Sequence, residues 1–138
     1  MFPGVHAKTD PDKPAVIMAE TGQTLTYHEL DQRSAAIAAA LRDLGLRRGD
    51  VIALLSDNVL EAFEIYWAAI RSGLYITAVN WHLAADEAAY IVNDCGARVL
   101  FASAEVGELA REIVSATPGV DHRFGFGGDI DGHRNYIE

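Results

Sequence analysis

Apolar positions along this chain alternate between two patterns, one typical of helices and one typical of buried strands. Four glycines stand at nearly equal intervals, each directly before an apolar, strand-like segment: Gly49, Gly73, Gly96 and Gly119. A glycine just past a helix end accepts the left-handed conformation that other residues resist. The spacing therefore predicts a repeated unit of helix, glycine stop and strand.

The segments between these glycines carry apolar residues at helical steps of three and four. One helix face in "TYHELDQRSAAIAAALRDLG" comprises Leu30, Ser34, Ile37, Leu41 and Leu44. Thr26 and Glu29 predict a capping box at the start of this helix, and Gly45 predicts its end. A second helix is expected to begin at Asn58, with Glu61 completing its cap.

Further helices are indicated in "DEAAYIVNDCG" and "EVGELAREIVSATPG". The strands between the helices are near-continuous apolar runs, which indicates a parallel sheet with crossover helices. Earlier in the chain, "AVIMAETGQTLTY" predicts a hairpin. The sequence therefore predicts an α/β fold: an N-terminal β-hairpin followed by a βαβαβαβ doubly wound, mainly parallel sheet with helices on both faces.

Composition divides the chain into three parts. Residues 1–13 are rich in Pro and Asp and are expected to be irregular. Residues 14–124 carry the α/β pattern. Residues 125–138 are rich in glycine and lack an apolar period, which predicts a loop or a tail whose packing partner lies elsewhere.

Size and charge narrow the class of protein. The chain has 138 residues, enough for one core, and a formal net charge of −9. That charge disfavours nucleic acid and anionic membrane surfaces as partners. No apolar run is long enough to span a membrane. The single cysteine, Cys95, is expected to be a small buried residue in a cytoplasmic protein.

Residue spacing alone assigns no reaction. No histidine lies at metal-ligand spacing from another histidine or a cysteine, so no metal site is predicted. No lysine follows Lys13, which excludes a Walker-type phosphate loop. The loop "NWHL" follows an apolar strand, where α/β proteins often bind ligands. Asn80 is expected to shape this loop and Leu83 to anchor the next helix, while Trp81 and His82 have no fixed role.

The order of motifs resembles the N-terminal region of the AMP-forming acyl-CoA synthetases, the adenylate-forming family that includes luciferases. The resemblance runs over roughly residues 14–104 and rests on "LTYHEL", "GLRRGDVIALLSDN", "EIYWAAIRSGLYITAVNWHL" and "DEAAYIVNDCGARVLFAS". It implies a parent enzyme that activates a fatty or other carboxylic acid with ATP and Mg²⁺, through an acyl-adenylate, and then transfers the acyl group to coenzyme A.

The family's catalytic motifs have no counterpart here: the chain contains no Thr-Ser-Gly-Thr-Thr-Gly run and no Asp-Gly-Trp. No catalytic, ATP-binding, substrate-binding or metal-binding residue is therefore assigned. We expect the fragment to bind no cofactor and to be inactive alone, and the parent could associate peripherally with membranes. The alternative is a stand-alone, non-catalytic α/β module for ligand binding or protein interaction. Exposed family interfaces would make the fragment self-associate, which light scattering would detect.

Overall fold

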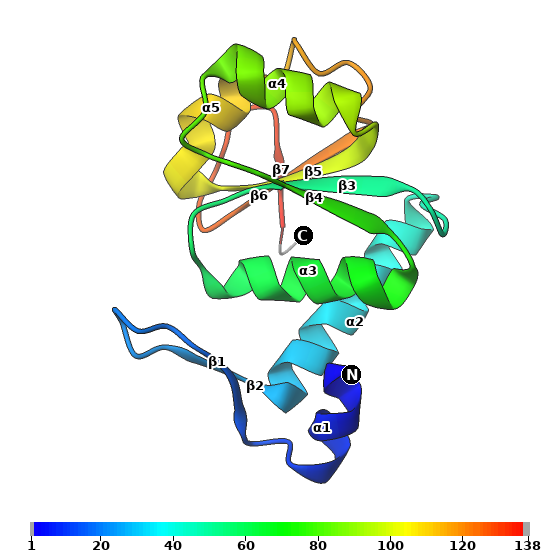
Figure 1. Cartoon of the computed structure of the whole chain (residues 1–138), viewed down its shortest axis with the longest axis vertical. Helices are drawn as coiled ribbons and strands as arrows, with labels where there is room; N and C mark the ends of the chain where they lie inside the picture. The colour runs from blue at the N-terminus through cyan, green and yellow to red at the C-terminus, as the bar shows by residue number, and fades with distance from the viewer. Residues whose placement is uncertain (1, 137–138) are drawn as a thin grey trace. The chain divides into compact units, whose positions relative to one another are not determined.

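The structure is a computed structural model that describes residues 2–136, and the chain divides into two units (Figure 1). The first unit holds the chain up to Arg48 together with Asn58–Gly73. The second unit holds Gly49–Asp57 and the chain from Leu74 onward.

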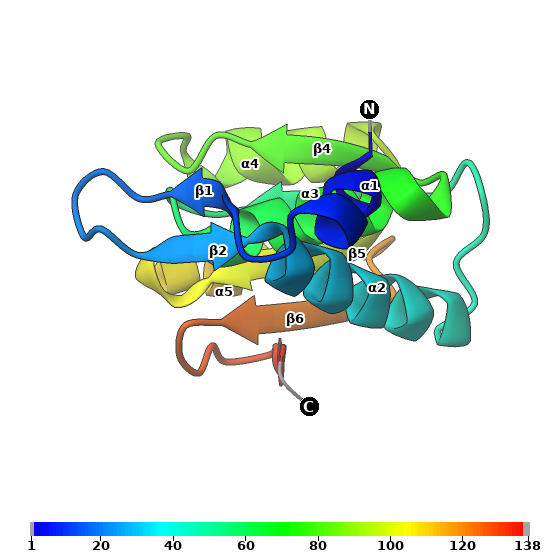
Figure 2. The same ribbon diagram turned by 90° about the horizontal axis from the view of Figure 1, so that it is seen from below.

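A parallel sheet forms the centre of the second unit. Its strands are β3 (Val51–Leu55), β4 (Tyr75–Val79), β5 (Ala97–Ser103), β6 (His122–Phe126) and β7 (Arg134–Asn135). They lie in the order β4-β3-β5-β6-β7, and every neighbouring pair is parallel. The arrows of β4 and β6 accordingly point the same way in Figure 2. The predicted α/β class with a mainly parallel sheet is confirmed.

Two helices of the second unit lie on one side of this sheet (Figure 1): α4 (Ala85–Asp94) and α5 (Gly107–Glu112), the latter preceded by the 3₁₀ turn η1 (Ala104–Val106). The core beneath them joins side chains of the central strands and of both helices, including Leu55, Leu100, Ala88, Val92 and Ala110. Cys95 packs against this core and is half-buried, and its thiol donates to the carbonyl of Val92 at 3.4 Å.

The first unit contains the predicted hairpin and two long helices. Strands β1 (Pro14–Ile17) and β2 (Thr24–Thr26) pair antiparallel, which confirms the hairpin. Helix α2 (Tyr27–Asp43) packs along α3 (Leu60–Ser72). Of the predicted apolar face of α2, three members are buried: Leu30, Ser34 and Leu41.

The starts of α2 and α3 show when local sequence signals correctly predict a helix cap. At α2, the Thr26 hydroxyl accepts from the Glu29 N–H at 3.1 Å, and the Thr26 N–H donates to the Glu29 carboxylate at 2.9 Å. The predicted capping box is confirmed, and its backbone hydrogen bond lowers the pKa of Glu29. The predicted Asn58 cap is wrong: α3 starts after Val59, whose backbone is extended, so Asn58 lies one residue too early.

The sequence predicts an irregular N-terminus, and this prediction is wrong: residues Pro3–Thr9 form helix α1. Proline is preorganised for the first helical position, where its missing N–H leaves no hydrogen bond unmade. Tertiary contacts hold this short helix. The Phe2 ring meets Trp67 edge-on at 6.1 Å, and the Arg71 guanidinium lies 4.9 Å from the Phe2 ring centre. Such long-range contacts leave no periodic signal in the sequence.

The glycine-rich tail is also more ordered than a loop. Strand β6 continues through Gly125 to Phe126, and β7 adds a strand at Arg134–Asn135. The residues between, 127–133, are called the strap below. Ile130 of the strap is 7 % exposed and packs on Gly125, so the strap does find a packing partner. The last two residues of the chain lie outside the described residues.

Helix α4 lacks half of its cap, and restoring it should stabilise the protein. Ala84 has almost the backbone conformation of Thr26 and donates its N–H to Glu87 at 3.1 Å, but its side chain has no oxygen to accept the return bond. Ala84→Ser should therefore raise the free energy of unfolding by about 1 kcal/mol.

Urea unfolding of this variant, followed by circular dichroism, measures the change. The matched control is Thr26→Ala, which removes the same half of the box from α2 and should lower the free energy by a similar amount. If Thr26→Ala destabilised the protein while Ala84→Ser had no effect, the proposed cap at α4 would be contradicted.

Candidate functional site

The carboxyl ends of the parallel strands form the candidate site. Ligands of open α/β sheets bind in the loops that leave these ends. In spatial order the loops here are residues 80–84 after β4, Ser56–Asp57 after β3, Ala104 after β5, and Gly127–Gly128 after β6. All four loops belong to the second unit.

The loop after β4 is shaped by Asn80, as predicted. The Asn80 side-chain oxygen accepts from the His82 N–H at 3.0 Å, and the Asn80 carbonyl accepts from the Leu83 N–H at 3.2 Å. Leu83 in turn packs against the core. These bonds fix a turn of the kind that asparagine favours.

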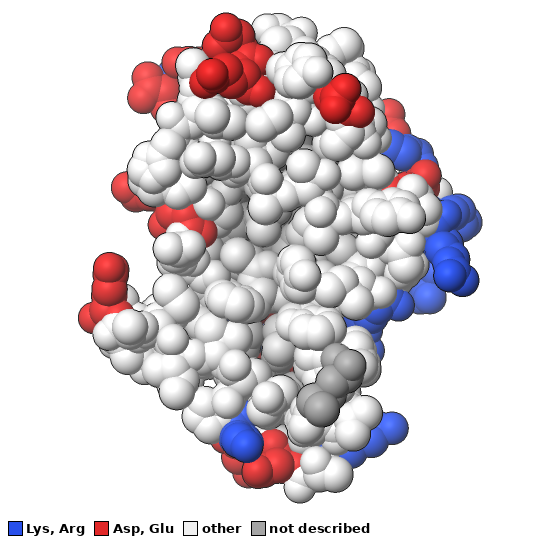
Figure 3. Space-filling view, in the orientation of Figure 1, with Lys and Arg blue, Asp and Glu red and all other residues white. Residues whose placement is uncertain are grey.

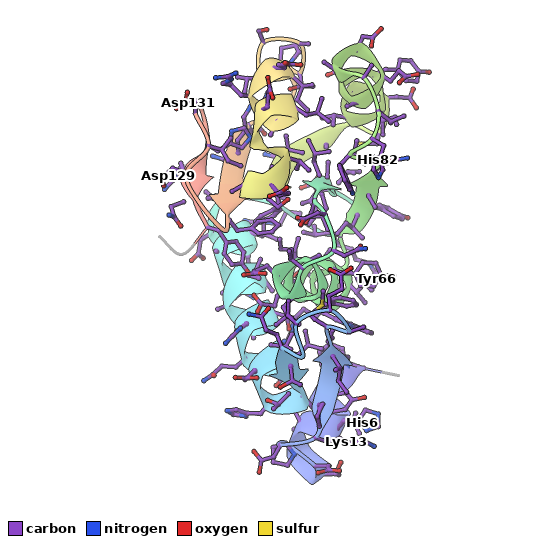
Figure 4. The ribbon with its side chains drawn as sticks, turned by 90° about the vertical axis from the view of Figure 1, so that its left-hand side faces the viewer. His6, Lys13, Tyr66, His82, Asp129 and Asp131 are labelled. Atoms are coloured by element: carbon purple, nitrogen blue, oxygen red, sulfur yellow. The ribbon has the colours of Figure 1, made fainter. Side chains whose placement is uncertain are left out.

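The two aromatic residues of this loop lie on the surface and on each other. The Trp81 and His82 rings stack at 3.7 Å between centroids, and Trp81 is 41 % exposed. The side chain of His82 lies at the margin of the second unit (Figure 4). The pair offers a flat aromatic surface beside the carboxyl end of β4, a feature that suits contact with an apolar or planar group.

A buried polar cluster joins the ends of β3 and β5, and no sequence motif singled it out. Ser103 is 3 % exposed, and its hydroxyl accepts from the Asp57 N–H at 3.3 Å. The Ser56 hydroxyl donates to the Asp57 carbonyl at 2.7 Å. One carboxylate oxygen of Asp57, Oδ1, is buried and has no hydrogen-bond partner within the part of the chain that the structure describes. A buried carboxylate oxygen is costly to leave unmatched, so this atom is an acceptor ready for a donor.

The loop after β6 approaches the neighbouring loop closely. A Cβ atom on Gly128 would lie 3.0 Å from the Cβ of Ala104, too near for any side chain without movement. Glycine at this position therefore lets the strap begin directly beside the end of β5.

At the amino ends of the parallel strands, charged side chains form ion pairs with one another. Arg98, at the start of β5, contacts the carboxylates of Asp50 and Asp121, each at 3.0 Å. Hydrogen bonds from Asp121 and Asp50 raise the pKa of Arg98. The amino end of the sheet thus has matched charges, whereas the carboxyl end keeps an unmatched acceptor at Asp57.

Residues 2–136 offer neither a cluster of metal-binding side chains nor a membrane-spanning helix. No group of three or more His, Cys, Asp or Glu side chains is placed to hold a metal ion. None of the helices described has the length and apolar character needed to cross a membrane.

Comparison with known proteins identifies the family. The model of the family "AMP-binding enzyme" matches residues 5–124. The chain is 38 % identical to a fatty acid–[acyl-carrier-protein] ligase from Streptomyces coeruleorubidus, over 82 % of this chain and 21 % of that protein. It is 31 % identical to a long-chain-fatty-acid–CoA ligase from Salmonella typhimurium, over 81 % of this chain and 20 % of that protein.

Solved structures agree with the sequence comparison. A crystal structure described as a putative long-chain-fatty-acid CoA ligase from Rhodopseudomonas palustris matches 98 % of this chain with a TM-score of 0.88 and 26 % identity, over 34 % of its own length. The chain spans about a fifth of the length of the two ligases that it matches in sequence. The family match covers most of the chain, and the chain therefore belongs to the AMP-binding enzyme family.

Proposed function

We propose that this chain is part of the N-terminal domain of an ATP-dependent, AMP-forming ligase that converts a fatty or related carboxylic acid into its coenzyme A thioester. The observation that carries the proposal is the family match over residues 5–124. The names of the relatives, which are ligases of fatty acids, support the substrate class.

The residues of this chain do not fit the triphosphate of ATP by themselves. A phosphate cradle combines glycine-rich backbone N–H groups at a helix N-terminus with a lysine. The Gly127–Gly128 turn leads into the strap and β7 rather than into a helix, and no lysine follows Lys13. Acidic side chains also gather over α4 in Figure 3. Binding of ATP and Mg²⁺ therefore falls to other parts of the parent enzyme.

In the parent enzyme, this chain would supply the loops at the carboxyl ends of the parallel strands. Asn80 fixes the loop that presents Trp81, and the exposed indole would line the region that holds the acid. The buried Oδ1 atom of Asp57 would accept a hydrogen bond from a group outside this chain. Both roles position other groups and involve no bond making or breaking by these residues.

Release of pyrophosphate tests the proposal. We expect the isolated chain, given ATP, Mg²⁺ and fatty acids, to release no pyrophosphate above a blank without acid. The full-length parent should release pyrophosphate only when acid and ATP are both present. Addition of coenzyme A should then yield the thioester.

The outcomes separate the two parts of the proposal. Turnover by the isolated chain would show that the fragment is catalytic after all. A full-length parent that folds but releases no pyrophosphate with any carboxylic acid would overturn the ligase assignment. Acyl transfer to an acyl carrier protein in place of coenzyme A would correct the acceptor alone.

A further inference from the structure

Two basic side chains, Arg123 on β6 and His133 at the end of the strap, influence each other electrostatically, and each has one buried nitrogen without a hydrogen-bond partner among the described residues. Arg123 of β6 uses Nη2 for three bonds: to the Val114 carbonyl at 3.1 Å, to the Thr117 carbonyl at 2.7 Å and to the Thr117 hydroxyl at 2.7 Å. Its other terminal nitrogen, Nη1, is buried and has no acceptor among the described residues. Burial lowers the pKa of Arg123.

The second side chain is His133, at the end of the strap. Its Nδ1 lies 3.1 Å from the carbonyl oxygen of Asp131, and because a carbonyl oxygen can only accept, Nδ1 carries the hydrogen. Nε2 then holds the lone pair of the neutral ring. Within residues 2–136, Nε2 is buried with no hydrogen-bond partner. Burial lowers the pKa of His133, the hydrogen bond to the Asp131 carbonyl opposes this shift, and the charge of Arg123 lowers the pKa further.

Within residues 2–136, the charged groups near His133 include no buried carboxylate. From β6 it faces the cation of Arg123. After α5, the strap touches the apolar side chain of Val114, which lies 3.5 Å from a Cβ built on Gly132. On the strap itself, Asp129 and Asp131 are exposed and their side chains point outward (Figure 4). Water therefore screens these two carboxylates from the half-buried ring.

We infer that the strap is a pH-sensitive latch, held on β6 and α5 while His133 is neutral and released when Nε2 takes up a proton from solvent. A proton on Nε2 places a second half-buried cation near Arg123, with no acceptor for the new N–H among the described residues. When the strap leaves, water solvates both cations. The neutral ring therefore favours the docked state, and the protonated ring favours release.

The direction of the pH effect follows from linkage. In the docked state the pKa of His133 lies below its ordinary value of about 6.5, so the docked strap binds fewer protons than the released one. Docking is then at full strength above about pH 6.5 and is lost as the pH falls through the lowered pKa.

Release would reach the candidate site. The strap begins at Gly127, and Gly128 lies against Ala104 at the carboxyl edge of the sheet. Release would also withdraw Ile130 from Gly107 and Gly125, and would free β7 from β6. Acidification would thus loosen the loop after β6, next to the carboxyl ends of β5 and β3 where Ser103 and Asp57 lie.

A pH titration of the ¹⁵N-labelled 138-residue chain by NMR tests the latch. Between about pH 7.5 and about pH 5, the His133 ring should titrate with a midpoint below about 6.5. The Tyr136 amide, which donates to Gly125 at 2.8 Å when the strap is docked, should move to its disordered position with the same midpoint. A ring midpoint at or above about 6.5, or a Tyr136 signal that ignores the titration, would overturn the proposal.

Two variants separate the charge from the packing. His133→Gln cannot take up the proton, so the Tyr136 amide should stay docked at about pH 5, whereas exposed His28→Gln should behave as the unmodified chain. Undocking of His133→Gln at low pH would contradict the latch. If the strap of His133→Gln does not dock even at neutral pH, Arg123→Met tests the latch instead. Removing the arginine charge should raise the titration midpoint of the His133 ring, and an unchanged midpoint would contradict the latch.

Discussion

Replacing Arg33 with methionine is expected to lower the free energy of unfolding by about 3 kcal/mol, because it removes the arginine that forms an ion pair with a buried carboxylate. Glu64 on α3 is 2 % exposed, and its Oε1 accepts from Arg33 Nη1 at 2.9 Å. Arg33 itself lies on α2 with half of its side chain exposed, so its own desolvation is incomplete. The cost of breaking this pair therefore depends on which partner is removed.

The reverse change should be much milder. Glu64→Leu removes the buried charge and leaves Arg33 able to turn to water and to Glu29, whose carboxylate lies 3.8 Å away. We expect a loss below about 1 kcal/mol. The double variant, Arg33→Met with Glu64→Leu, should recover most of the stability lost in Arg33→Met alone.

Urea unfolding at neutral pH, followed by far-UV circular dichroism, measures all three variants. Equal losses for Arg33→Met and Glu64→Leu would show that the buried carboxylate does not control this interface. So would a double variant as unstable as the sum of the two single variants.

The elements that the sequence predicted are those whose causes are local. The capping box at α2 needs only Thr26 and Glu29, three residues apart, and both of its bonds are present. The turn after β4 needs only Asn80 and its own backbone, and it too is present. The apolar runs that form the central strands β3 and β5 are equally legible, because a strand buried in a parallel sheet needs near-continuous apolar character.

The elements that the sequence did not predict depend on contacts across the chain. Helix α1 is held by the meeting of Phe2 with Trp67, and no period in the first thirteen residues signals that contact. The polar cluster of the candidate site pairs Asp57 with Ser103, 46 residues away. Ser103 ends β5 and Asp57 lies two residues after β3, and they meet because β3 and β5 are neighbours, an order that the sequence leaves open.

The packing of the glycine-rich tail also depends on a contact that the sequence pattern does not reveal, the contact of Ile130 with Gly125. Gly125→Ala is expected to lower the free energy of unfolding by about 2 kcal/mol. The Cβ atom that it adds would lie 3.1 Å from Cδ1 and 3.2 Å from Cγ1 of Ile130, which is itself buried. The backbone of Gly125 does not have a positive φ, so crowding rather than strain accounts for the loss.

A second substitution tests that cause. Ile130→Ala alone should cost about 2–3 kcal/mol, because it leaves a cavity above β6. In the double variant the added methyl group enters the space that Ile130 vacates. The combined loss should therefore be smaller than the sum of the single losses by about 1–2 kcal/mol.

Gly119→Ala provides the matched control, because a Cβ atom there meets nothing within 4 Å and its φ is not positive. It should change the free energy of unfolding by less than about 0.5 kcal/mol. Urea unfolding of the four variants on one scale gives the coupling directly. Additive losses at Gly125 and Ile130, or a Gly119→Ala loss as large as that of Gly125→Ala, would contradict the contact. A coupled loss would show that a tail with no apolar period is held in place because one isoleucine fits over one glycine.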